Sequence, residues 1–300
     1  MILAQGFISI DRHANGTTYM HQPKIIARCL ELLGLNNTSK RHDIPDDANI
    51  ILQRNTNGPK RTQDWNYRSV IGVLNYVQAM TRPDISYAVH KCARFCQAPK
   101  ASHELAVKRI GRYLASTKDK GIILTPNPSK GFECYVDADW AGNWHDDYAN
   151  DDASVLSRTG YIITYAGCPI IWSSKMQTLI ALSTTEAEYI ALSSALRKVI
   201  TLMNILSELR DFNIPIPTST PIIRCRVFED NMAALELARE PKFCPHTKLL
   251  AVRLHHFRDH IRRKLITIKH VSTKEQVADI ITKPLARDQF CNLRALLMGW

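Results

Sequence analysis

The second half of the chain predicts an α/β fold built on a mixed sheet. Three β-like segments come first, at Cys134–Trp140, Gly160–Ala166 and Pro169–Ser173. Gly167 stands at the turn between the last two. A long amphipathic helix, Glu186–Leu209, follows with apolar residues at helical spacing. Strands and helices then alternate, which predicts one sheet with helices on its faces.

The remaining elements of this half are short. Two further strands are expected, at Ile222–Phe228 and Leu265–Val271. Three further helices are expected, at Asn231–Arg239, Leu250–Lys264 and Lys274–Lys283. The complete order predicts five strands, with the long helix between the third and the fourth.

The first half of the chain is organised differently. A β-like segment at Gly6–Ile10, an Asn-Gly turn and a helix near Pro23–Leu33 form a piece too short to be a domain alone. A polar linker follows at Thr38–Gln63. Tyr67–Lys118 predicts helices interrupted at Pro83, since proline is tolerated in the first turn of a new helix. We therefore expect three segments, 1–63, 64–126 and 127–300.

Composition points to a soluble globular protein with a polyanionic partner. Apolar residues make up 45% and charged residues 22% of the 300 residues. The formal net charge is +11 and the pI is about 9.3. Such a basic excess favours nucleic acid as the partner. An unrelated basic enzyme is the alternative on charge alone.

The pattern of cysteines and the hydropathy of the chain indicate the cellular compartment in which the protein is expected. The eight cysteines are scattered and form no Cys-x-x-Cys pair, so no zinc knuckle is expected. This usage is typical of a reducing, intracellular compartment, either cytoplasm or nucleus. There is no secretory signal and no apolar run of the ~18 residues that suggest a membrane span. We therefore expect no membrane partner.

Two aspartates on the first predicted strand of the α/β half are candidates for chemistry. Asp137 and Asp139 are two residues apart, so they face the same side of a strand at about 6.6 Å. Two carboxylates on an otherwise apolar strand repel each other, and a bound cation would offset the repulsion. The alternative is an exposed edge strand with two solvated aspartates.

The long helix carries two glutamates that face different ways. Ser183 and Glu186 fit a capping box, which gives Glu186 a structural role. Glu188 lies about 200° further round the helix and shares a stripe with Leu192 and Val199. A carboxylate directed toward the core needs a partner. If one of the two glutamates is catalytic, we expect it to be Glu188.

Two further aspartates are weaker candidates. Asp230 lies where a strand ends and a helix begins, a common place for sites in α/β sheets, although aspartate is also a favoured N-cap. Glu229 is expected to point elsewhere. Thr273 and Gln276 fit a second capping box, which would place Asp279 in the second turn of the last helix. By itself Asp279 indicates only a helical aspartate.

Taken together, Asp137, Glu188, Asp230 and Asp279 follow the order strand, helix, strand end, helix. Four carboxylates in that arrangement can hold two divalent ions about 4 Å apart for phosphodiester hydrolysis. Hard oxygen ligands favour Mg²⁺ or Mn²⁺ over zinc.

Seven segments between Tyr67 and Leu285 resemble, in order, the C-terminal part of copia-type retrotransposon polyproteins. These segments are Tyr67–Tyr76, Thr81–Val89, Lys108–Leu114, Asp137–Gly142, Leu182–Ala191, Glu229–Asn231 and Gln276–Leu285. Residues 1–45 resemble, more weakly, the tail of a reverse transcriptase domain. The first segment of the chain is then this tail with a linker, and residues 64–126 are a helical connection region.

The resemblance implies a ribonuclease H (RNase H)-like fold over 127–300, a five-stranded mixed sheet flanked by helices. It implies cleavage of the RNA strand of RNA–DNA hybrids with two metal ions, and it carries the family's acidic residues onto Asp137, Glu188, Asp230 and Asp279. The upstream reverse transcriptase region of the same polyprotein is a further expected partner. Because the chain starts at Met1 inside the polymerase region, we expect it to be a fragment.

The sequence departs from the family pattern at two places, which leaves an alternative function to consider. The loop Asn143–Arg158 is longer than usual, and Lys248–Val252 lacks a His and an Asp of the family pattern. A non-catalytic nucleic-acid-binding remnant is therefore the alternative function.

Polymerase activity is not expected, because Ala138 separates the two aspartates and no palm domain precedes them. Five basic residues are candidates for phosphate contacts: Lys175, Arg262, Arg263, Lys264 and Lys269.

Overall fold

The structure is a computed structural model that describes residues 7–36, 40–54, 58–146, 151, 154–216, 222–239 and 257–300. Its contacts divide the chain into two compact units. We call the first the helical unit; it comprises Met1–Leu124, Asn143–Val155 and Lys283–Trp300. The second, the sheet unit, comprises Thr125–Gly142 and Leu156–Thr282. The bounds of these two units differ from those of the three segments expected from the sequence, 1–63, 64–126 and 127–300. That division stays a prediction.

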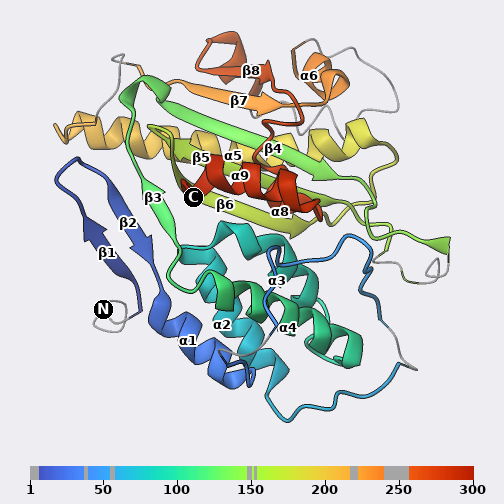
Figure 1. Ribbon diagram of the computed structural model, residues 1–300. Helices are drawn as coiled ribbons and strands as arrows, with labels where there is room; N and C mark the ends of the chain where they lie inside the picture. Colours follow the sequence, from blue (N-terminus) through green and yellow to red (C-terminus); the bar gives the residue numbers. More distant parts are fainter. Residues whose placement is uncertain are drawn as a thin grey trace. The chain divides into compact units, whose positions relative to one another are not determined.

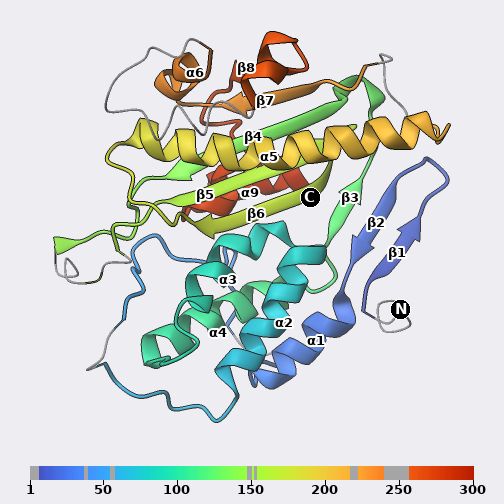
Figure 2. The same ribbon diagram turned by 180° about the vertical axis from the view of Figure 1, so that it is seen from behind.

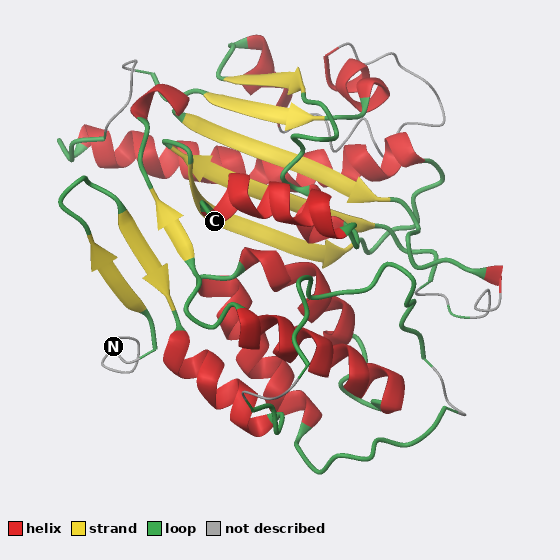
Figure 3. Cartoon of the chain, in the orientation of Figure 1, coloured by secondary structure: helices red, strands yellow, loops and turns green. Residues whose placement is uncertain are grey.

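The helical unit contains a three-stranded antiparallel sheet, in the order β1-β2-β3, and a group of helices (Figure 3). Its strands are β1 (Ser9–Arg12), β2 (Thr18–His21) and β3 (Ile122–Leu124). Its helices are α1 (Pro23–Leu32), α2 (Tyr67–Met80), the 3₁₀ helix η1 (Pro83–Ile85), α3 (Ser86–Ala93), α4 (Ala101–Ser116) and α9 (Arg287–Met298). The predicted interruption at Pro83 is confirmed, because η1 separates α2 from α3.

The sheet unit is built on five strands in the order β6-β5-β4-β7-β8 (Figure 1). They are β4 (Phe132–Asp139), β5 (Arg158–Tyr165), β6 (Cys168–Met176), β7 (Cys225–Glu229) and β8 (Ile266–His270), and the 3₁₀ helix η2 (Pro128–Lys130) precedes them. β4, β5 and β6 pair antiparallel, whereas β7 pairs parallel with β4 and with β8. The sheet is therefore mixed, as predicted, and β4 lies at its centre.

Helix α5 (Thr184–Asp211) covers one face of this sheet (Figure 2). Its start is fixed by Ser183, whose side chain accepts a hydrogen bond from the amide of Glu186 at 3.1 Å. The predicted apolar stripe is buried against β4 and β5, with Leu192, Leu196 and Val199 fully covered. Among the described residues, α5 is also the helix long and apolar enough to cross a membrane, but core helices meet the same criterion.

The other helices of the sheet unit are short. α6 (Met232–Arg239) follows β7, residues 257–262 are helical before β8, and α8 (Asp279–Thr282) comes last. α8 lies on the face opposite α5, against β4 and β5 (Figures 1 and 2). The sheet is thus flanked by helices on both faces. Residues 250–256 of the expected helix Leu250–Lys264, and the segment Lys248–Val252, lie outside the described residues.

The predicted start of the helix Lys274–Lys283 is wrong. Residues 273–278 form turns, and α8 begins at Asp279. The expected capping box does not form, because Gln276 uses its side chain elsewhere. The Nε2 of Gln276 donates to the backbone oxygen of Val136 at 2.7 Å, and its Oε1 accepts from the amide of Ala278 at 3.4 Å. Gln276 therefore fastens this segment to β4, and Asp279 stands in the first turn of α8 instead of the second.

Candidate carboxylate site

Asp137 lies near the end of the central strand β4 and is 1% exposed. In the ladder it stands opposite Gly160 of β5. The hydroxyl of Thr282, in α8, donates a hydrogen bond to its carboxylate. A carboxylate at so buried a position is costly unless it is hydrogen-bonded or paired with a cation. The sequence-based alternative of an exposed edge strand with solvated aspartates is wrong for Asp137.

Glu188 and Glu186 divide their roles as the helix faces predict. The side chain of Glu186 reaches back to the start of α5, where it accepts from the amide of Leu182 at 2.8 Å. Glu188 is 7% exposed and lies on the buried side of the helix. The capping function therefore keeps Glu186 at the helix end, whereas Glu188 is directed inward.

Asp230 follows the last residue of β7 and is half-buried. Its alternative role as an N-cap is taken by Asn231, whose Oδ1 accepts from the amide of Ala234 at 3.0 Å. The carboxylate of Asp230 instead accepts from the hydroxyl of Thr273 at 3.2 Å. That contact links the end of β7 to the segment after β8.

Asp137, Glu188 and Asp230 converge in the fold. One carboxylate oxygen from each lies within 4.8 Å of the corresponding oxygens of the other two. Three negative charges this close repel one another strongly where burial lowers the dielectric. Carboxylate oxygens are the ligands that Mg²⁺ and Mn²⁺ prefer. The donor set therefore fits a hard divalent cation, and a cation would relieve the repulsion.

Asp279 is fully buried in the first turn of α8, outside this group of three. Its helix nevertheless packs against β4 and β5, and Thr282 of the same helix bonds to Asp137. Asp139, the other candidate on β4, is also outside the group. It lies against the turn after the strand, where a Cβ built on Gly142 would come within 1.8 Å of its Oδ2.

Glu229 is a buried acidic residue that the sequence reasoning assigned to no role. It is 0% exposed, and its Oε1 accepts from the amide of Asn231 at 3.2 Å. Burial raises the pKa of Glu229 well above its usual range, and the charges of Asp230 and Asp137 raise it further. Its signal in the sequence was the strand period, because Cys225, Val227 and Glu229 alternate as the buried residues of β7.

Gly160 permits the close packing of α8 on the sheet beside Asp137. A Cβ at this position would lie 2.2 Å from Cγ2 of Thr282 and 3.1 Å from Cγ1 of Ile281. We expect Gly160→Ala to push α8 outward and lower the free energy of unfolding by about 1–3 kcal/mol. Urea unfolding would measure the change. Gly72→Ala is the control, because a Cβ there meets nothing within 4 Å. Equal stability of the two variants would contradict this packing.

Comparison with known proteins places the chain in a family. No protein-family model matches it. The retrovirus-related Pol polyprotein from transposon RE1 of Arabidopsis thaliana is 39% identical over 235 residues, 78% of this chain. The chain belongs to the copia-type Pol polyproteins. The Pol polyprotein from transposon TNT 1-94 of Nicotiana tabacum is 33% identical over 279 residues, 91% of the chain.

The chain covers only a small part of these polyproteins, 15% of the RE1 protein and 19% of the TNT 1-94 protein. Among solved structures, LC11-RNase H1 in complex with an RNA/DNA hybrid is similar over 50% of this chain and 93% of its own. The identity is 16% and the TM-score 0.33.

Proposed function

We propose that this chain carries an RNase H domain that hydrolyses the RNA strand of RNA–DNA hybrids. The convergence of Asp137, Glu188 and Asp230 within 4.8 Å is the observation that carries the proposal. Its supports are the membership of the chain in the copia-type Pol polyproteins and the net charge of +11, which favours a polyanionic substrate. In the complete polyprotein the upstream reverse transcriptase region would supply the hybrid.

The carboxylates of Asp137, Glu188 and Asp230 would hold Mg²⁺ or Mn²⁺, with Asp279 as the proposed fourth ligand from α8. A pair of such ions, when bound, activates water and stabilises charge on the phosphate and the departing oxygen. The protein's own groups keep the ligands in place. Thr282 orients Asp137, Thr273 orients Asp230, and the inner face of α5 orients Glu188.

Preference for a hybrid would come from contacts to ribose 2′-hydroxyls across the wide minor groove of an A-like duplex. The 2′-hydroxyl distinguishes RNA from DNA, so a DNA duplex of the same sequence should bind through phosphates and remain intact. Hydrolysis by an activated water would leave a 5′-phosphate and a 3′-hydroxyl.

The purified chain, incubated with a hybrid labelled on its RNA strand, is expected to cut the RNA in Mg²⁺ or Mn²⁺ and to leave it whole in EDTA. Gel electrophoresis would measure the products, with DNA duplex and single-stranded RNA as control substrates. Salt-sensitive binding of the hybrid without cleavage in either metal would contradict the nuclease and favour a non-catalytic nucleic-acid-binding remnant.

A further inference from the structure

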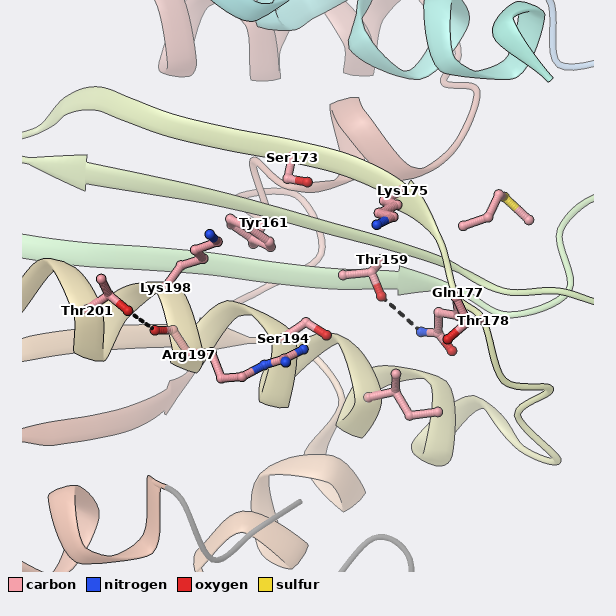
Figure 4. Close-up of a pocket in the computed structure, with 12 residues that line it drawn as sticks. Thr159, Tyr161, Ser173, Lys175, Gln177, Thr178, Ser194, Arg197, Lys198 and Thr201 are labelled. Carbon is pink, nitrogen blue, oxygen red and sulfur yellow. Dashed lines mark hydrogen bonds between the residues drawn. The ribbon is translucent and has the colours of Figure 1, made fainter. Parts of the chain in front are cut away.

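A second polar feature of the sheet unit lies between α5 and the edge strand β6 (Figure 4). It is a cavity of about 420 Å³ lined from β5, β6 and α5. Its lining contains three cationic side chains, Lys175, Arg197 and Lys198, and no acidic one. The carboxylate ligands described above do not line it.

The α5 side of this cavity is a regular stripe. Ser194, Arg197, Lys198 and Thr201 follow the spacing i, i+3, i+4, i+7, so they share one face of the helix. The hydroxyl of Thr201 donates to the backbone oxygen of Arg197 at 2.8 Å. Arg197 and Lys198 are exposed, and no ion pair joins either to an acidic residue in the described part of the chain.

The sheet side supplies a fixed polar floor. Gln177 is buried and donates to Thr159 at 3.1 Å and to the backbone oxygen of Ala187 in α5 at 2.9 Å. These bonds hold the end of β6 against β5 and the helix. Burial raises the pKa of Tyr161, whereas its hydrogen bond to Ser173 and the nearby charge of Arg197 lower it. The floor therefore offers the hydroxyl groups of Thr159, Tyr161 and Ser173 beside the amide of Gln177.

Such a lining suits a phosphodiester. Lysine and arginine donate to phosphate oxygens, and hydroxyl groups add neutral hydrogen bonds. Nothing in the lining would repel an anion. Arg197 and Lys198 lie nine and ten residues beyond Glu188 on one helix, a rise of roughly 14–15 Å. That rise corresponds to about four base steps at 3.4 Å per nucleotide.

We propose that the cavity bounded by Lys175, Arg197 and Lys198 binds backbone phosphates of the nucleic acid whose scissile bond lies at the carboxylates. This inference rests on the proposed function for the identity of the substrate. It gives Lys175, already a candidate for a phosphate contact from the sequence, a place in a lined cavity, and it adds two cations of α5, Arg197 and Lys198. The contact is to the backbone, so it is independent of base sequence.

The test uses the full chain and a fluorescein-labelled RNA–DNA hybrid of about 20 base pairs, long enough to exceed the four-step separation several times. Fluorescence anisotropy in EDTA measures binding without cleavage over a series of salt concentrations. The variant is Lys175→Gln, Arg197→Gln, Lys198→Gln. The control removes three other cations of the sheet unit: the exposed Lys130 and Arg224, which precede β4 and β7, and the partly exposed Arg210 in the last turn of α5.

The cavity variant is expected to bind with a shallower salt dependence, its slope reduced by about 1 for each lost phosphate contact. At 0.1 M salt each lost contact should weaken binding about 8-fold, from a slope of 0.9 per phosphate. The control should stay within about twofold, because charges further away than ~10 Å are screened. A third variant, Lys175→Arg, Arg197→Lys, Lys198→Arg, should keep the slope of the wild type.

Several results would overturn the inference. One is an equal loss of hybrid binding in the cavity variant and in the control. Another is a loss of hybrid binding in the charge-preserving variant as well. Selective loss of binding to phosphatidylserine vesicles, with hybrid binding unchanged, would assign the cavity to a membrane surface. Thermal unfolding of each variant verifies folding. If the wild type binds the hybrid but never cleaves it, the proposed nuclease activity is wrong and the phosphate site is unaffected. If the wild type cleaves and the cavity variant binds as tightly as the wild type, the phosphate site is wrong and the nuclease activity is unaffected.

Discussion

Replacing Asp137 with asparagine is expected to reduce hydrolysis of an RNA–DNA hybrid by roughly 10³-fold or more. The group of three carboxylates would lose one of its negative charges. Metal-ion catalysis contributes several kcal/mol of transition-state stabilisation, and each 1.36 kcal/mol is a factor of ten in rate. Initial rates of RNA cleavage in Mg²⁺ would measure the loss.

Asp139→Asn is the matched control for this experiment. The two aspartates are two residues apart on β4, but Asp139 lies outside the carboxylate group. We expect this variant to cleave within about threefold of the wild type, since it leaves the three ligands intact. Equal activity of Asp137→Asn and wild type, or equal losses in both variants, would be incompatible with the proposed site.

The same substitution gives a readout that does not depend on activity. Without metal, Asp137→Asn removes one of three mutually repelling charges, so its thermal stability in EDTA should match or exceed that of the wild type. Added Mn²⁺ should raise the midpoint of the wild type, because an ion that binds only the folded state stabilises it. The variant should show a smaller rise. Together the two scans separate lost metal binding from a misfolded site.

The sequence could predict the inward glutamate but not the geometry around the last aspartate. The angle of Glu188 on the long helix predicts its inward direction, since an amphipathic helix has a fixed period and one buried stripe. The Thr273–Gln276 pattern looks like a capping box and predicts Asp279 one turn too far into its helix. Gln276 instead bonds to Val136, some 140 residues away, a contact that no local pattern encodes.

Glu229 illustrates a different limit. The sequence predicts a strand that ends at Phe228 and a Glu229 that points away from Asp230, whereas β7 continues to Glu229 and the alternation of buried residues continues with it. Burial here depends on the pairing of β7 between β4 and β8, which is a tertiary fact. The parallel pairing of β4 with β7 also brings Asp137 near Asp230, and the sequence could supply this only through family resemblance.

Replacing Asp84 with alanine is expected to lower the free energy of unfolding by about 3–5 kcal/mol, because it leaves a buried cation without its partner. Arg82 and Asp84 are both buried in the helical unit. The guanidinium donates to the carboxylate from Nε at 2.9 Å and from Nη2 at 2.8 Å. Urea unfolding followed by circular dichroism would measure the loss.

The partners around this pair explain why it should be so sensitive. Tyr113 of α4 donates to Asp84 at 2.5 Å, and Arg82 donates to the backbone oxygen of Thr117 at 3.0 Å and to its hydroxyl at 2.8 Å. The pair thus joins the interruption at Pro83 to the end of α4. Asp84→Asn should cost less than alanine, because its amide oxygen still accepts a hydrogen bond.

The exposed pair of Arg287 and Asp43 provides the contrast. Its Nε–Oδ2 distance is also 2.8 Å, but both side chains are about two-thirds exposed, so solvent screens the pair and Asp43→Ala should destabilise the protein far less than Asp84→Ala. The difference between the two variants reflects burial together with the additional hydrogen bonds that Asp84 accepts from Arg82 and Tyr113. If Asp84→Ala lowered the free energy of unfolding as little as Asp43→Ala does, solvent would have to reach Arg82. The chain around Pro83 would then be stabilised by apolar packing and not by this ion pair.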